Sequence, residues 1–262
     1  KNDDGSIYVY VTYDRLDYSS LQVTASKTGY TTLGIFDKAS GGIQLWGNGG
    51  QCLNDGTYWK DNTWIYAGDV TLYFQYKDAT APVIERTTYV INSARNGYDV
   101  YAYVTDNEAI NRVQFPTWTK KDDQDDLLQP WYTRSEYTGT SGSWTVDGKV
   151  YNYKFTVLVS AHNNEYGTYN THIYAYDNAG NYVQAKPTFQ VNFSWNITYD
   201  LAGGTKGATN PATYLSKETA QSITLSNPTR TGYSFAGWKS SVSGITVASE
   251  KITIPAETHA DV

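Results

Sequence analysis

Alternation of two residue types along short runs is the feature that most restricts the fold of this chain. In residues 100–105 (Val-Tyr-Ala-Tyr-Val-Thr), aliphatic side chains occupy every second position and tyrosines lie between them. A closely similar run covers residues 7–12, and further alternating runs cover residues 70–77, 151–158 and 172–176. Because successive side chains of a strand point to opposite faces, these runs predict strands with one apolar face and one aromatic or polar face.

Turn-forming clusters separate the predicted strands. They are Gly47-Asn48-Gly49-Gly50, Asn54-Asp55-Gly56, Asp147-Gly148 and Asn178-Ala179-Gly180-Asn181. The 33 Thr and 25 Tyr also outnumber the 46 charged residues (20 basic and 26 acidic), and both types suit a pleated sheet better than a helix. Short strands at this spacing are typical of antiparallel sandwiches, so we expect a mainly β protein.

Two proline-containing stretches divide the chain into predicted modules. Residues 78–83 contain the first Pro, which lacks an N–H group and suits an extended linker. A second boundary lies near residues 186–192. A weak internal repeat relates residues 68–79 to residues 167–179, and both segments end close to an Asp. The predicted modules are residues 1–80, 81–192 and 193–262.

Composition and charge exclude several classes of function. The net charge is −6, and no cluster of Lys and Arg provides the electrostatic surface that nucleic acid requires. No run approaches the roughly 20 apolar residues of a membrane span, so membrane insertion is not expected. The chain contains no Met, which indicates an excised piece of a longer protein. We expect a monomeric segment, with Cys52 free of any internal disulfide.

Motifs in the middle module resemble a known family. They are residues 113–119 (VQFPTWT), 124–127 (QDDL), 131–132 (WY), 162–169 (HNNEYGTY) and 172–180 (HIYAYDNAG). In this order they resemble the GBS Bsp-like repeat, over residues of about 95–183. Gln129-Pro130 and residues 137–149 depart from the family pattern. The resemblance implies a non-catalytic, Ig-like module of secreted or wall-attached proteins of Gram-positive bacteria, often found beside cell-wall hydrolases.

The last module carries a second set of motifs. They are residues 197–205 (ITYDLAGGT), 210–214 (NPATY), 223–225 (ITL) and 227–238 (NPTRTGYSFAGW). They resemble a Listeria–Bacteroides (internalin B-type) repeat over residues of about 195–262, with Ala202 where that family usually has Asn. The resemblance implies a small β-grasp-like spacer or adhesion module, here without its closing strand. The predicted fold is therefore mainly β, with tandem Ig-like antiparallel β-sandwiches, the first one unassigned, followed by a truncated β-grasp-like repeat.

No catalytic constellation is recognisable in the sequence. The segment His162-Asn163-Asn164-Glu165 does not have the His-Glu-x-x-His spacing of a zinc protease. Cys52 lies in a turn rich in Gly and Asn, with no His nearby in sequence to activate a thiol. Residues 203–207 lack the spacing of a phosphate-binding loop. We therefore predict that the segment is not an enzyme and needs no cofactor.

Two groups of side chains contain the residue types that bind metal ions. The acidic run at residues 122–126 lacks the Gly and the distant Glu of a calcium-binding EF-hand loop, so we expect a solvated or turn-capping loop, with calcium as the alternative. His162, Glu165 and His172 would bind zinc only if their loop folded back onto the strand. A structural hydrogen-bonding role is the favoured interpretation for these three, and no metal site is predicted.

An aromatic cluster in the first module is the candidate binding site. Trp46, Tyr58, Trp59 and Trp64 lie within 20 residues, interleaved with Asn, Gln and Asp. Flat rings cover the apolar face of a sugar while polar groups bind its hydroxyls, so this cluster predicts carbohydrate binding. The hypothesis requires exposed rings, because a sandwich core also buries Trp. Trp118, Trp131 and Trp238 lie inside the family motifs and are expected in the core.

These observations favour a non-catalytic adhesion or positioning segment of a large secreted or wall-anchored surface protein of a Gram-positive bacterium. Its expected location is extracellular, and its expected partner is a polysaccharide, a glycan or a host surface protein. The alternative is the accessory region of a multidomain extracellular hydrolase (peptidase, wall amidase or glycosidase), where it acts as a spacer or targets the enzyme to its substrate.

Overall fold

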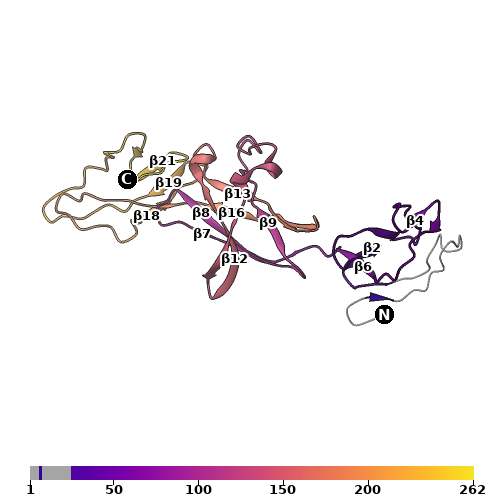
Figure 1. Cartoon of the computed structure of the whole chain (residues 1–262). Helices are drawn as coiled ribbons and strands as arrows, with labels where there is room; N and C mark the ends of the chain where they lie inside the picture. The colour runs from indigo at the N-terminus through magenta and orange to yellow at the C-terminus, as the bar shows by residue number, and fades with distance from the viewer. Residues whose placement is uncertain (1–5, 8–24) are drawn as a thin grey trace. The chain divides into compact units, whose positions relative to one another are not determined.

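The computed structural model of the chain describes residues 6–7 and 25–262 (Figure 1). These residues form two compact units. The first contains the described part of residues 1–82 together with 106–109 and 177–181, and the second contains residues 83–105, 110–176 and 182–262. All but the first residue of the strand expected at residues 7–12 lies outside the described part of the chain.

The first unit contains one four-stranded antiparallel sheet and one hairpin. The sheet order is β1-β6-β2-β3, formed by Ser6–Ile7, Leu72–Asp78, Tyr30–Phe36 and Gln44–Gly47 respectively. Strands β4 (Trp59–Lys60) and β5 (Thr63–Trp64) form the hairpin. Asp61 and Asn62 have φ values of 48° and 60°, the left-handed backbone of a two-residue hairpin turn. This turn places Trp59 directly opposite Trp64.

The second unit begins with a four-stranded antiparallel sheet in the order β11-β12-β8-β7. Its strands are Thr140–Val146, Lys149–Leu158, Gly97–Thr105 and Val83–Ile91. Asp147 and Gly148, with φ values of 47° and 73°, connect β11 to β12. The hairpin turn predicted at these two residues is therefore confirmed.

Two three-stranded antiparallel sheets complete the middle of the second unit. One has the order β10-β13-β16, formed by Thr117–Thr119, Gly167–Thr171 and Thr188–Val191. The other has the order β15-β14-β9, formed by Tyr182–Ala185, Ile173–Asp177 and Ile110–Gln114. Three single 3-10 turns, η1 (Trp131–Thr133), η2 (Ser135–Tyr137) and η3 (Val159–Ala161), lie in the connections.

The alternation along β8 explains how these sheets pack. Its apolar face joins a buried core with side chains from β9, β13, β14 and β16 (Tyr98, Val100, Ala102, Val104, Val113, Tyr169, Ile173, Ala175, Phe189 and Val191). The core therefore has walls from several sheets, as in a sandwich. On the opposite face, Tyr101 packs beside Trp144 and Tyr151, and the Arg86 guanidinium lies 3.9 Å from the ring centre of Tyr103.

The C-terminal part of the second unit has its own small sheets and core. Strand β17 (Ser194–Asn196) pairs with β18 (Thr213–Leu215). Strands β19 (Gln221–Thr224), β21 (Lys251–Ile254) and β20 (Thr246–Ala248) form a second sheet in that order. A separate core contains Ile197, Tyr214, Leu225, Ile252 and Ile254.

The prediction of a mainly β, antiparallel protein is confirmed. The described residues contain no helix long and apolar enough to cross a membrane. The boundary at Pro82 lies close to the predicted end of the first module, and the division of the remainder into two modules stays a prediction.

Candidate functional site

The aromatic cluster predicted to bind sugar lies in the core of the first unit. Trp46 and Trp59 are fully buried, and Trp64 and Tyr58 are 3% and 9% exposed. The rings pack on one another, with centroids 5.3 Å apart for Trp46 and Trp59 and 5.4 Å apart for Trp59 and Trp64. The exposed platform that the sugar-binding hypothesis requires is therefore not formed by these four residues. Their large rings fill the core of a small unit that has no disulfide.

The acidic run at residues 122–126 anchors its loop to the chain segment that carries His162. The Asp126 Oδ2 atom lies 2.7 Å from His162 Nδ1 and also accepts a hydrogen bond from the Thr119 backbone N–H. Both side chains of the Asp126–His162 pair are almost completely buried. Asp125 accepts a hydrogen bond from Asn163. The run therefore has a structural role through its last two residues.

Glu165 and His172 also have structural partners. Glu165 is buried, accepts a hydrogen bond from the Thr119 hydroxyl and lies 3.4 Å from Lys121 Nζ. Lys121 also pairs with Glu257 at 3.0 Å, and this hydrogen bond is the main cause of the raised pKa of Lys121. The His172 ring packs against Trp118 at 4.6 Å, and burial lowers the pKa of His172. Among the described residues, His162, Glu165 and His172 do not form a metal-binding group.

The only thiol has the surroundings of a structural cysteine. Cys52 is half-buried, and its Sγ–H group donates a hydrogen bond to Asn62 Oδ1 at 3.3 Å. Burial raises the pKa of the thiol, which lowers the fraction of reactive thiolate at neutral pH. Neither a charged nitrogen nor an imidazole is among its described hydrogen-bond partners.

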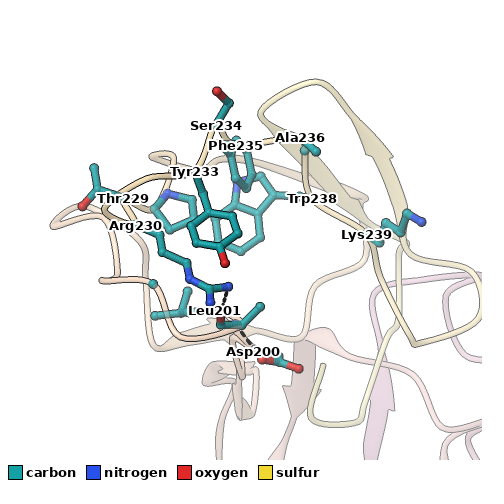
Figure 2. Close-up of a pocket in the computed structure, with 14 residues that line it drawn as sticks. Asp200, Leu201, Thr229, Arg230, Tyr233, Ser234, Phe235, Ala236, Trp238 and Lys239 are labelled. Carbon is teal, nitrogen blue, oxygen red and sulfur yellow. Dashed lines mark hydrogen bonds between the residues drawn. The ribbon is translucent and has the colours of Figure 1, made fainter.

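A cleft in the C-terminal part of the second unit is lined by three aromatic side chains, Tyr233, Phe235 and Trp238 (Figure 2). It has a volume of about 350 Å³, within the usual range for small-ligand sites. Two chain segments form its walls, residues 200–204 and residues 228–239. Reciprocal backbone hydrogen bonds between Thr205 and Thr229, of 2.7 and 3.1 Å, hold these two segments together.

The rings of the cleft differ from the core rings of the first unit in their exposure. Tyr233 is 67% exposed and Phe235 is 38% exposed, while Trp238 is half-buried and lies 5.3 Å from the Phe235 ring. Trp118 is buried, and Trp131 and Trp238 are half-buried and pack against hydrophobic cores, in agreement with the expectation for these three residues. The sequence contains no signal that Trp238 also forms part of a cleft wall.

Charged side chains lie beside these rings. The Arg230 guanidinium stacks over Tyr233 at 3.9 Å and donates a hydrogen bond to the Ala202 carbonyl at 2.8 Å. Figure 2 shows the Arg230 side chain beside the Tyr233 ring. Asp200 accepts a hydrogen bond from the Ala202 N–H, and Lys239 also lines the cleft. The lining thus offers flat rings with both positive and negative groups, and contains neither an imidazole nor a thiol. This chemistry suits binding of a polar ligand with an apolar face.

Backbone geometry at Ala202 gives a physical meaning to its departure from the family pattern. Ala202 and Gly203 have φ values of 47° and 82°, so they form a left-handed turn at the edge of the cleft. Asn tolerates this conformation better than Ala, which agrees with the preference of the family at this position.

Comparison with known proteins identifies two segments of the chain. The family model of the GBS Bsp-like repeat matches residues 87–189, and that of the Listeria-Bacteroides repeat domain matches residues 195–259. Neither the curated proteins nor the solved structures contain a significant match. The two families and their order are those predicted from the motifs. The first match begins at residue 87, eight residues before the start of about residue 95 that the motifs predicted. The chain therefore carries a GBS Bsp-like repeat at residues 87–189, followed by a Listeria-Bacteroides repeat domain at residues 195–259.

Proposed function

We propose that this chain is a non-catalytic adhesion and positioning segment of a large secreted or wall-anchored surface protein of a Gram-positive bacterium. Its two identified repeats are of kinds typical of bacterial surface proteins, and neither repeat family is catalytic. The described candidate sites agree with this proposal, because the buried His162 and the half-buried Cys52 have structural partners. The function is to hold and direct neighbouring parts of the surface protein and to bind a target.

The target is a polysaccharide or host glycan that binds the cleft of the C-terminal repeat. The exposure of Tyr233 and Phe235 carries this part of the proposal. A large aromatic ring contributes roughly 150–250 Å² of buried area when covered, so two neighbouring exposed rings favour a ligand that covers them. Beside the rings, Arg230 would donate hydrogen bonds to hydroxyl or acidic groups of the sugar, and Asp200 would accept hydrogen bonds from its hydroxyl groups.

A glycan array tests the proposal, with the full chain as the probe. We expect binding to a restricted set of glycans or wall polymers. The double substitution Tyr233→Ala and Phe235→Ala is expected to weaken that binding at least about tenfold, or about 1.4 kcal/mol. Tyr182→Ala serves as the matched control, because Tyr182 is 56% exposed and lies in the other repeat.

Two results contradict the proposed ligand. One is an array without signal, and the other is binding that is unchanged by the double substitution. An array without signal, together with a catalytic domain in the parent protein, favours the alternative function as the accessory region of an extracellular hydrolase.

A further inference from the structure

Three aspartates from distant parts of the sequence meet in the first unit. Asp78 is the last residue of β6, Asp106 follows the end of β8, and Asp177 is the last residue of β14. Each supplies a carboxylate oxygen, and the three oxygens lie within 4.8 Å of one another. The segments 106–109 and 177–181 belong to the same compact unit as Asp78. We propose that Asp78, Asp106 and Asp177 bind a calcium ion.

Burial and missing partners indicate that the group is built for a cation. Asp78 is only 7% exposed and Asp177 only 4%. The Oδ2 atom of Asp78 and the Oδ1 atom of Asp106 are buried and have no hydrogen-bond partner. An acceptor left without a partner in the interior is unfavourable, and more so when it is charged. A bound cation would satisfy both atoms.

The negative charge of the three carboxylates also favours a bound cation. Carboxylates this close repel one another, and one usual remedy is a Lys or Arg partner. In the described part of the chain, no Lys or Arg forms an ion pair with any of the three. A bound cation would supply the positive charge that the three carboxylates lack.

Surrounding hydrogen bonds hold the carboxylates in place. Asn107 Nδ2 donates to Asp78 Oδ1 at 3.1 Å, and the Glu108 N–H donates to Asp106 Oδ2 at 3.1 Å. Asn181 donates to Asp177 through its backbone N–H at 2.8 Å, and its side chain also reaches the Asp78 carbonyl at 3.1 Å. Such outer partners orient metal ligands before the ion binds.

The ligand chemistry selects calcium. All three ligands are carboxylates, and the group contains no His or Cys, which zinc and copper favour. Calcium accepts six to eight oxygen ligands in flexible geometry, so backbone oxygens and water can complete the site. Magnesium requires a stricter octahedral arrangement and loses its water reluctantly. The internal repeat agrees with this site, because the related segments 68–79 and 167–179 supply Asp78 and Asp177.

The test uses the full chain freed of metal with EDTA and then titrated with calcium chloride. Calorimetry is expected to show one calcium ion bound at this site, and the melting temperature is expected to rise with calcium concentration. Asp106→Asn is expected to weaken this binding at least tenfold while it keeps the hydrogen bond from Glu108. Asp122→Asn is the matched control in the acidic run at 122–126, and it leaves binding unchanged.

Thermal unfolding in EDTA distinguishes a calcium ligand from a carboxylate that only stabilises the fold. Without calcium, Asp106→Asn is expected to melt at the same temperature as the wild type or higher, because a repulsive charge is removed. With calcium, the wild type is expected to melt higher than the variant. The proposal is overturned if no calcium binds, if binding is unchanged in Asp106→Asn, or if this variant melts lower than the wild type by the same amount with and without calcium.

Discussion

The first unit and the C-terminal repeat each gather aromatic side chains within a short stretch of sequence, yet their rings have opposite exposure. Trp46, Trp59 and Trp64 are at most 3% exposed, whereas Tyr233 is 67% exposed. Trp46, Trp59 and Trp64 lie on paired strands, and Trp59 is directly opposite Trp64 in its hairpin. Tyr233 lies in a segment without strands, where no sheet face covers the ring. Aromatic density in a sequence therefore does not indicate a binding surface unless the strand pairing is also known.

Replacement of a buried aromatic ring of the first unit should lower stability far more than replacement of an exposed ring of the cleft. Trp59→Ala is expected to destabilise the first unit by about 3–5 kcal/mol, because it removes a fully buried ring and leaves a cavity. Tyr233→Ala, as the matched change in the cleft, is expected to alter the free energy of unfolding by no more than about 0.5 kcal/mol. Urea denaturation of both variants measures the difference. Equal effects of the two substitutions would remove the distinction between core and cleft.

The acidic run at 122–126 contains a similar contrast between a buried and an exposed residue. Asp126→Asn is expected to lower the free energy of unfolding by about 2 kcal/mol, because it weakens charge-assisted hydrogen bonds with His162 and Thr119. Asp122→Asn is expected to have little effect, since Asp122 is exposed and Asn tolerates its φ of 54°. Denaturant unfolding of the two variants checks this expectation. A larger loss in Asp122→Asn would contradict the structural role of Asp126.

The turn beside the cleft offers a stabilising change. Ala202→Gly is expected to raise the free energy of unfolding of the C-terminal repeat by about 0.5–1 kcal/mol, because Gly adopts a φ of 47° without strain. Thermal unfolding of the full chain measures the shift. A destabilised variant would indicate that the Ala202 side chain makes contacts that outweigh the backbone strain.

The smallest expected effect is the contribution of His172, in the middle repeat, to the pH dependence of the free energy of unfolding. Burial holds the pKa of His172 below its ordinary value of 6.5, so the unfolded chain binds more protons than the folded chain in this range. The contribution of His172 to stability is present above about pH 6.5 and is lost as the pH falls through the lowered pKa. Between about pH 7.5 and about pH 5, the free energy of unfolding should therefore fall less in His172→Gln than in the wild type. An identical loss in both proteins would show that other groups cause it.

Much of the fold was predictable from local patterns. Alternation over residues 100–105 predicted a strand with one buried face, and β8 has that face in the core. Asp147-Gly148 predicted a hairpin turn because both residues tolerate positive φ. The two repeats were recognisable because their motifs are local in sequence and occur in a fixed order.

The sites were harder to predict because they depend on contacts between distant residues. Strands β4 and β5 have only two residues each, too short to show which face of Trp59 is buried. The cleft brings Asp200 to residues about 30 positions later, through a bridge between Thr205 and Thr229. Asp78, Asp106 and Asp177 are far apart in sequence, and only the strand topology brings them together.

Nuclear magnetic resonance of the eight Trp indole N–H groups tests the central claim most directly. The full chain is titrated with a glycan that it binds, and the chemical shift of each indole is followed. We predict that the Trp238 signal moves with saturation, while the signals of Trp46, Trp59 and Trp64 stay in place. Movement of those three signals with an unchanged Trp238 signal would contradict the assignment of one aromatic set to the core and the other to the binding cleft.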